Sequence, residues 1–241
     1  MVGHMTDYAR FSWTVLLPVK VLARAKSRLA VLAGDRRHEL ALALASDTVS
    51  AVVACPEVAR VIVVTSDPVA GPRLAALGAH IVPEPIGNPS ELSRESADGS
   101  QHALNAALLW GAAVAARRWP GTGLAALTAD LPALRPAELA TALRAAGHGI
   151  PAGFGPGAAF VPDSAGVGTT LYAVPPGGEF RPMFGGASRA RHAAAGAAEL
   201  TLDGIAGLRQ DVDTPDDLRA AVTLGVGPRT AEVAADLLAD V

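Results

Sequence analysis

Short apolar runs alternate with longer stretches of helical spacing through the first 146 residues. The run WTVLLPV at 13–19 is apolar and partly β-branched, as expected of a buried strand. The stretch at 35–54 opens with Asp35, a residue type that caps helices, and Leu40 and Leu44 then begin a near-helical repeat. The pattern therefore predicts strands and helices in alternation.

This alternation predicts a three-layer α/β architecture. We expect strands at 13–19, 59–67, 79–85 and 123–130, and helices at 35–54, 68–78, 100–119 and 136–146. Strands that alternate with helices build a mostly parallel central sheet that is covered on both faces, with right-handed crossovers.

The chain changes character after this point. Residues 149–178 are rich in Gly and Pro around two short strand-like runs, AAFVPD and TTLYAV, which we interpret as a small antiparallel elaboration that carries a site. The remaining expected elements are a helix near 187–196, a strand near 198–202, a helix from Pro215 and a tail helix at 228–241. We expect a disordered or tag-derived N-terminus at 1–12. Because no repeat or linker divides the rest of the chain, we expect a single domain at 13–241.

Composition narrows the choice of partners. Half of the 241 residues are apolar, which allows a large core, and a net charge of −3 gives no global basic field for nucleic acid. The lone Cys55 cannot form an internal disulfide, which fits a reducing compartment. We see no signal peptide and no run of about 18 apolar residues, so we expect a cytoplasmic location and no membrane partner. The sequence leaves open whether the chain forms a homo-oligomer.

The first candidate for chemistry is Asp130, which ends the apolar run GLAALTAD. In an open parallel sheet, ligands bind outside the carboxyl ends of the strands. A carboxylate at that edge can hold a divalent cation without full burial. The alternative is that Asp130 caps the turn DLPAL, which is a common task of aspartate.

A second acidic candidate is the stretch RQDVDTPDDL at 209–218. Asp211 and Asp213 flank one residue, so in an extended chain both side chains point the same way, as a metal clamp requires. For Asp216 and Asp217 we prefer a structural role, because the preceding Thr-Pro pair starts a helix whose first turn favours acidic side chains.

Basic residues gather in PVKVLARAKSRLA, directly after the first expected strand. Lys20, Arg24, Lys26 and Arg28 place four cations within nine residues of a chain that has no net positive charge. A loop of this kind at the carboxyl end of a strand can bind phosphates. It lacks the P-loop pattern, so a Walker-type ATPase is not indicated. The alternative is a solvated basic helix face.

Glycine-rich stretches provide a second candidate anion site. AGVGTTLYAV at 165–174 and FGGASRARH at 184–192 let the backbone approach a ligand, and Thr169 and Ser188 can donate to an anion. Ser188 also falls at an expected helix start, where amide donors favour phosphate. The basic residues that follow, including His192, add positive charge, although a packing role explains the histidine equally well.

Two anion sites and two acidic stretches suggest phosphoryl or nucleotidyl transfer. In such reactions, basic clamps and positioning contribute more than a protein nucleophile. His102 and Asn105 share one side of a predicted helix and are weaker candidates.

Six stretches also occur in the order and approximate spacing of one family: LPVKVLARAKSRLA, LNAAL, ADLPAL, GVGTTLYAV, FGGASRARH and GLRQDVDTPDDL. From about residue 13 to 228 the chain resembles the phosphoenolpyruvate or 2-phospho-L-lactate guanylyltransferases of coenzyme F-420 biosynthesis. The motifs KxxxxAKSRL and DVDTPxDL are the specific part of this resemblance, whereas DLPAL is shared by many nucleotidyltransferases. The resemblance implies a GT-A-like (Rossmann-like) nucleotidyltransferase fold, GTP as the donor and Mg²⁺ as the cofactor.

The resemblance also implies roles for single residues. It assigns catalysis to Lys20, Lys26 and Asp130, nucleotide binding to Pro18, Lys20, Lys26, Ser27, Arg28 and Asn105, acceptor binding to Thr169, Gly185 and Ser188, and the metal to Asp130, Asp211 and Asp213. The chain departs from the family pattern at Ala103, Ala129 and 186–187, which bears on the acceptor pocket more than on the reaction type.

Phosphoenolpyruvate is the expected acceptor, because an Ala-, Arg- and Gly-rich composition is typical of actinobacterial sequences and that branch of the family is associated with it. 2-Phospho-L-lactate and 3-phosphoglycerate stay open as acceptors. One alternative function is a molybdopterin or sugar-phosphate nucleotidyltransferase, which usually carries a glycine-rich loop after its first strand, where this chain has KVLARAKSRLA. Another is a GT-A glycosyltransferase, whose DxD motif matches DVD but normally follows a mid-chain strand, where this chain has TAD. A non-catalytic nucleotide-binding protein is the alternative from another class, and it would release no pyrophosphate.

Overall fold

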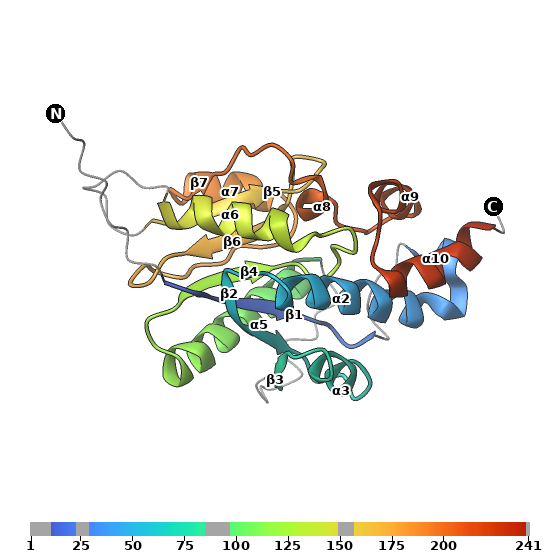
Figure 1. Cartoon of the computed structure of the whole chain (residues 1–241), viewed down its shortest axis with the longest axis horizontal. Helices are drawn as coiled ribbons and strands as arrows, with labels where there is room; N and C mark the ends of the chain where they lie inside the picture. The colour runs from blue at the N-terminus through green and yellow to red at the C-terminus, as the bar shows by residue number, and fades with distance from the viewer. Residues whose placement is uncertain (1–10, 23–28, 85–96, 149–156, 240–241) are drawn as a thin grey trace.

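The computed structural model describes residues 11–22, 29–84, 97–148 and 157–239. Within these residues one sheet of seven strands runs through the molecule in the order β3-β2-β1-β4-β6-β5-β7 (Figure 1). The strands are β1 (Trp13–Pro18), β2 (Val58–Val64), β3 (His80–Val82), β4 (Gly123–Leu127), β5 (Ala159–Pro162), β6 (Thr169–Val174) and β7 (Ala198–Glu199).

The helices follow the strands in sequence and cover both faces of the sheet. They are α1 (Ala30–Ala33), the 3-10 turn η3 (Gly34–Arg36), α2 (Arg37–Val53), α3 (Ala70–Ala75), α5 (Ala97–Arg118), α6 (Pro136–His148), α7 (Ser188–Ala194), α8 (Ala206–Arg209), α9 (Pro215–Leu224) and α10 (Pro228–Ala239). The expected alternation of strands and helices is confirmed.

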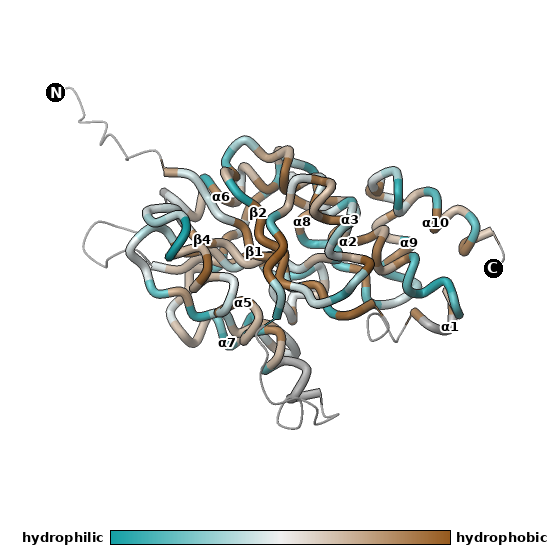
Figure 2. Tube along the Cα trace, turned by 90° about the horizontal axis from the view of Figure 1, so that it is seen from below, coloured by the Kyte–Doolittle hydropathy of each residue, from teal (hydrophilic) through white to brown (hydrophobic). Residues whose placement is uncertain are grey.

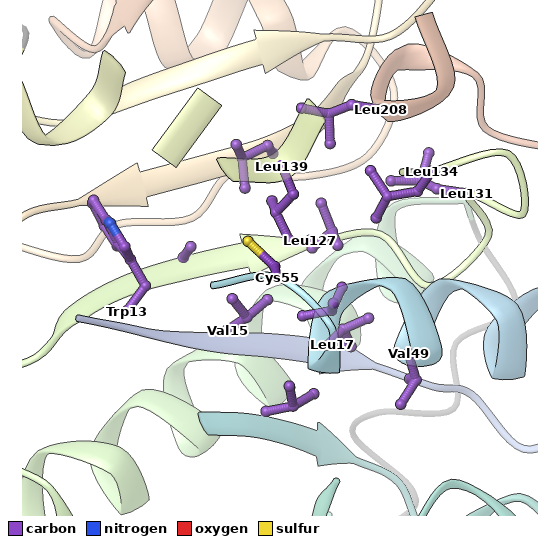
Figure 3. Close-up of a cluster of buried hydrophobic side chains, with 14 of the residues drawn as sticks. Trp13, Val15, Leu17, Val49, Cys55, Leu127, Leu131, Leu134, Leu139 and Leu208 are labelled. Atoms are coloured by element: carbon purple, nitrogen blue, oxygen red, sulfur yellow. The ribbon is translucent and has the colours of Figure 1, made fainter. Parts of the chain in front are cut away.

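The central strand β1 is buried on both faces because its side chains alternate between two cores. Val15 and Leu17 pack into a cluster with residues of α2, α3, α6 and α8 (Figure 3). Leu16 points the other way, into a second cluster that α5 closes. The hydropathy colouring of Figure 2 shows the resulting apolar centre around β1, β2 and β4.

A third core joins the C-terminal helices to the rest of the molecule. Leu40 and Leu44 of α2 pack with residues of α9 and α10. The carboxylate of Asp47 on α2 accepts a hydrogen bond from the backbone N–H of Thr230 at 2.7 Å, and so satisfies one of the first amides of α10. A buried aspartate therefore fixes where the last helix begins.

The order of the strands creates a switch point in the sheet. β1 pairs with β2 on one side and with β4 on the other, in both cases in parallel. The chain passes outward from β1 to β2 and β3, and then returns through α5 to β4. In sheets of this type, ligands bind where the strand order reverses, outside the carboxyl ends of the flanking strands.

The expected antiparallel elaboration is also confirmed. β6 pairs antiparallel with β4 and with β5. The short β7 then adds to β5 in parallel. The mostly parallel half and the antiparallel half thus share one continuous sheet.

Several details differ from the sequence expectations. Asp35 does not cap α2: it lies in the 3-10 turn, and the N-cap of α2 is Arg36, which makes no side-chain capping bond. β4 ends at Leu127, so Asp130 belongs to the following turn. The short helix α8 was not expected, because four residues are too few to show a periodic pattern. Among the described helices, none has the length and apolarity that crossing a membrane requires.

Candidate functional site

Asp130 lies beyond the end of β4, in a turn that two distant parts of the chain hold. Its backbone carbonyl accepts a hydrogen bond from the N–H of Val212 at 3.1 Å. The next amide, of Leu131, donates to the Thr48 hydroxyl on α2 at 2.9 Å. The turn is therefore fixed by its backbone, and the Asp130 side chain remains partly exposed at the sheet edge.

The bond between Asp130 and Val212 brings the two acidic stretches side by side. Val212 is fully buried, whereas its neighbours Asp211 and Asp213 are partly and largely exposed. The two aspartates therefore flank a buried anchor next to Asp130. Their role in binding a metal stays a prediction.

Asp130, Asp211 and Asp213 are the candidate ligands for Mg²⁺. Within the described residues, no group of three or more His, Cys, Asp or Glu side chains gathers in a way that could hold a metal ion. Mg²⁺ does not need such a cage, since it usually keeps several waters and binds one or two carboxylates together with substrate phosphates. That Asp130 holds Mg²⁺ together with Asp211 or Asp213 and substrate phosphates stays a prediction.

The structural role expected for Asp216 and Asp217 is confirmed. The carboxylate of Asp217 accepts from the backbone N–H of Thr214 at 2.7 Å, while the Thr214 hydroxyl accepts from the N–H of Asp217. This capping box satisfies free amides at the start of α9. Asp216 forms an exposed ion pair with Arg219.

The basic stretch leaves β1 at the same sheet edge. Pro18 is the last residue of the strand, and Lys20 is exposed just beyond it. The predicted residues Arg24, Lys26, Ser27 and Arg28 lie outside the described residues. Their contact with a nucleotide stays a prediction.

Asp67, which sequence reasoning missed, anchors the start of that basic stretch. Its side chain is 6% exposed and accepts a hydrogen bond from the N–H of Leu22 at 2.8 Å. It also accepts from the amides of Val69 and Ala70, both at 2.8 Å. Burial by itself raises the pKa of Asp67, but these backbone donors outweigh it and the net pKa is lower than usual. The available signal was an aspartate close behind a strand, the same signal that identified Asp130.

The glycine-rich half reaches the same edge through β6. Thr169 opens β6, and the next carbonyl, of Thr170, accepts from the N–H of Thr128 at 3.0 Å, just after β4 ends. The Thr169 hydroxyl lies 3.0 Å from Nδ1 of His192. The predicted acceptor residue Thr169 is therefore close to the turn that carries Asp130.

Residues 183–186 form a loop, here called the glycine loop, beside the start of α7. Gly185 and Gly186 have φ angles of 97° and 45°, which L side chains rarely adopt. The side-chain amide of Asn105 on α5 bonds both backbone groups of Phe184, at 2.9 and 3.1 Å. Asn105, predicted to bind nucleotide, thus holds the glycine loop to α5.

Ser188 is buried at the first position of α7. Its N–H donates to the carbonyl of Gly186 at 2.8 Å, so this amide serves the glycine loop. The helix has seven residues, and so brief a helix contributes little macrodipole to anion binding.

The RARH segment at 189–192 does not offer the positive charge that was expected for an anion. Its two arginines bond other groups of the protein, and its histidine is neutral. Arg189 forms a two-pronged ion pair with Glu199 at 2.8 and 2.9 Å, and Arg191 donates to the carbonyls of Met183 and Gly185. His192 is fully buried, and burial, with a smaller contribution from Arg191, lowers its pKa to about 4. The expectation that His192 adds positive charge is wrong, because the ring is neutral at pH 7.

The chain is an α/β protein whose fold is similar to that of a nucleotide-diphospho-sugar transferase structure. The chain superposes with a TM-score of 0.60 on the crystal structure of a proposed nucleotide-diphospho-sugar transferase from Desulfovibrio desulfuricans G20, with 95% of this chain and 94% of the other covered at 16% identity. That likeness confirms the expected fold. No family model matches the chain.

Close relatives define the family more narrowly. The chain is 54% identical over 235 residues to phosphoenolpyruvate guanylyltransferase of Thermomonospora curvata, which covers 98% of this chain and 94% of the relative. It is 56% identical over 227 residues to the protein of the same name from Streptomyces coelicolor, which covers 94% and 97%. The chain belongs to the phosphoenolpyruvate guanylyltransferase family, a family of nucleotidyltransferases.

Proposed function

We propose that this protein transfers GMP from GTP to the phosphate of phosphoenolpyruvate and releases pyrophosphate. The observation that carries the proposal is identity above 50% over nearly the whole chain to relatives that bear the name of this activity. The product would be the guanylylated precursor in coenzyme F-420 biosynthesis, made in the cytoplasm, where GTP is available.

The geometry supports the proposal because three predicted binding segments lie at one edge of the sheet. Lys20 follows β1 and Asp130 follows β4, and these two strands are parallel neighbours. Thr169 begins β6, which runs antiparallel to β4, so its amino end lies beside the carboxyl end of β4. In the proposed site, basic, acidic and hydroxyl side chains from these segments would bind a triphosphate and a phosphorylated acid outside the switch point.

The chemistry needs positioning more than a protein base. A phosphate oxygen of the acceptor attacks the α-phosphorus of GTP in line, a new P–O bond forms, and the bond to the β-phosphate oxygen breaks as pyrophosphate leaves. The acceptor phosphate is already ionised at neutral pH, so no side chain must remove a proton. When bound, Mg²⁺ neutralises charge on the phosphate oxygens.

Each group of residues has one task in this scheme. Asp130, with Asp211 or Asp213, would hold the metal against the phosphates. Lys20, together with Lys26 and Arg28, would bind the triphosphate, and the Thr169 hydroxyl would donate to the acceptor. These assignments follow from the family motifs and from the shared sheet edge.

A pyrophosphate-release assay tests the proposal. GTP is combined with phosphoenolpyruvate, 2-phospho-L-lactate or 3-phosphoglycerate, each with and without Mg²⁺, and ATP replaces GTP in a parallel series. We expect turnover with GTP and phosphoenolpyruvate that depends on Mg²⁺. A preference for 2-phospho-L-lactate would correct the acceptor, and no turnover with any of the three acids would overturn the proposal.

A further inference from the structure

His192 is a fully buried histidine beside the predicted acceptor residue Thr169. It lies on α7 with 0% of its surface exposed, and both of its ring nitrogens have partners. Nδ1 is 3.0 Å from the hydroxyl of Thr169, and Nε2 accepts a hydrogen bond from the N–H of Met183 at 2.9 Å. One imidazole therefore joins the start of β6 to the glycine loop.

The partners of the ring determine where its proton resides. A backbone N–H can only donate, so Nε2 of His192 must be the acceptor nitrogen. The ring is neutral because burial lowers its pKa to about 4, and its single proton must then be on Nδ1. Nδ1 consequently donates to the Thr169 oxygen, and the hydroxyl hydrogen of Thr169 points to another acceptor.

Packing holds the ring in the orientation that makes both hydrogen bonds. Tyr172 stacks on His192 with ring centroids 4.6 Å apart and 18° between the planes. Phe184 approaches the ring edge-on at 5.5 Å, and Phe160 lies at 5.6 Å. A ring flip would also exchange Nε2 with a ring carbon, so the N–H of Met183 would lose its acceptor.

We propose that His192 is a positioning residue that makes the Thr169 hydroxyl an obligatory hydrogen-bond donor toward the anionic oxygens of the acceptor. This inference rests on the proposed function. Carboxylate and phosphate oxygens at neutral pH accept hydrogen bonds, so a hydroxyl whose hydrogen pointed inward would present a lone pair and repel them. The same ring accepts a hydrogen bond from the amide of Met183. It therefore also fixes the first residue of the glycine loop, which contains Gly185.

Two substitutions at position 192 separate the two bonds. In His192→Asn the amide nitrogen replaces Nδ1 and can still donate to Thr169, whereas in His192→Gln the amide oxygen replaces Nε2 and can still accept from Met183. We expect His192→Gln to raise the KM for the acceptor about tenfold or more and the KM for GTP less than about twofold. His192→Asn should recover most of the affinity for the acceptor. Equal increases in both KM values would contradict the proposal.

A double substitution tests whether His192 acts through Thr169. Thr169→Val alone should raise the acceptor KM by a factor similar to that of His192→Gln, and Thr169→Ser should restore it. In the Thr169→Val background, His192→Gln should add less than about a twofold increase, because the hydroxyl that it orients is already gone. If the two effects multiply, His192 does not act through Thr169. His80→Gln, at an exposed histidine on β3, is the matched control, and its kinetics should match those of the unaltered protein.

A measurement without substrate keeps this inference separate from the proposed function. The ¹⁵N chemical shifts of the His192 ring in the free protein report which nitrogen carries the proton. We expect a neutral ring protonated at Nδ1 at pH 7. A ring protonated at Nε2 would overturn the inference whatever the enzyme's substrate, whereas the expected tautomer in a protein that turns over no acceptor would overturn only the proposed function.

Discussion

Charged side chains with the same sequence signal have different uses in the folded protein. Arg189 and Arg191 follow a glycine-rich loop as anion-binding arginines do, yet both bond groups of the protein itself. Asp67 and Asp130 both follow strands, but Asp67 is buried and bonded by three backbone amides, whereas Asp130 is partly exposed. Whether a side chain serves the fold or a ligand thus depends on contacts that the sequence pattern does not contain.

The buried ring of His192 predicts a loss of stability in acid. Its pKa is about 4 in the folded protein, against an ordinary value of 6.5, so between these values the unfolded chain binds a proton that the folded protein does not. The contribution is complete above about pH 6.5 and decreases as the pH falls toward 4, by about 2 kcal/mol at pH 5. Among the facing groups, Arg191 contributes to the lowered pKa of His192, and Tyr172, whose pKa is raised by burial, stays neutral in this range.

Urea unfolding at pH 7, 6 and 5 measures this effect. The free energy of unfolding of the unaltered protein should decrease more steeply with acid than that of His192→Gln, which has no ring to titrate. Identical pH dependence in the two proteins would show that the histidine is not held neutral by the fold.

Short connections at the ends of strands position the site more than the strands do. The turn after β4 is held by Thr48 of α2 and by Val212, and the stretch after β1 is held by Asp67 behind β2. Each of these bonds joins residues far apart in the chain. The helices and strands could therefore be predicted from local periodicity. The long-range hydrogen bonds that position the turns after β1 and β4 could not.

The anchoring role of Asp67 makes a prediction about nucleotide binding. Asp67→Ala removes the acceptor of the Leu22 amide and of the first amides near α3, so the basic stretch after β1 loses its fixed starting point. We expect the KM for GTP to rise several-fold, the KM for the acceptor to change little, and stability to fall by about 1–3 kcal/mol.

Steady-state kinetics with each substrate varied in turn, together with urea unfolding, test this prediction. Asp203→Ala, at an exposed aspartate before α8, serves as the control. An Asp67→Ala protein with reduced stability but an unaltered KM for GTP would limit Asp67 to a structural role.

For the whole molecule, the sequence predicted the layers correctly because buried parallel strands and amphipathic helices have distinct apolar patterns. The order of the strands, with β4 beside β1, and the meeting of Asp130 with the stretch around Val212 depend on long-range packing. Asp35 was expected to cap a helix because its residue type is common at caps, but the chain enters α2 through a 3-10 turn instead. The neutral state of His192 depends on burial among aromatic rings, which no local pattern records.

The central claim is that Asp130, beyond the carboxyl end of β4, serves the reaction at the switch point. Pyrophosphate release from GTP and phosphoenolpyruvate by Asp130→Asn, compared with Asp216→Asn on α9, tests it most directly. Asp130→Asn should lower kcat/KM by about 100-fold or more while its unfolding free energy stays within about 1 kcal/mol of the unaltered protein, and Asp216→Asn should keep full activity. An Asp130→Asn protein whose kcat/KM is within twofold of the unaltered enzyme would contradict the account.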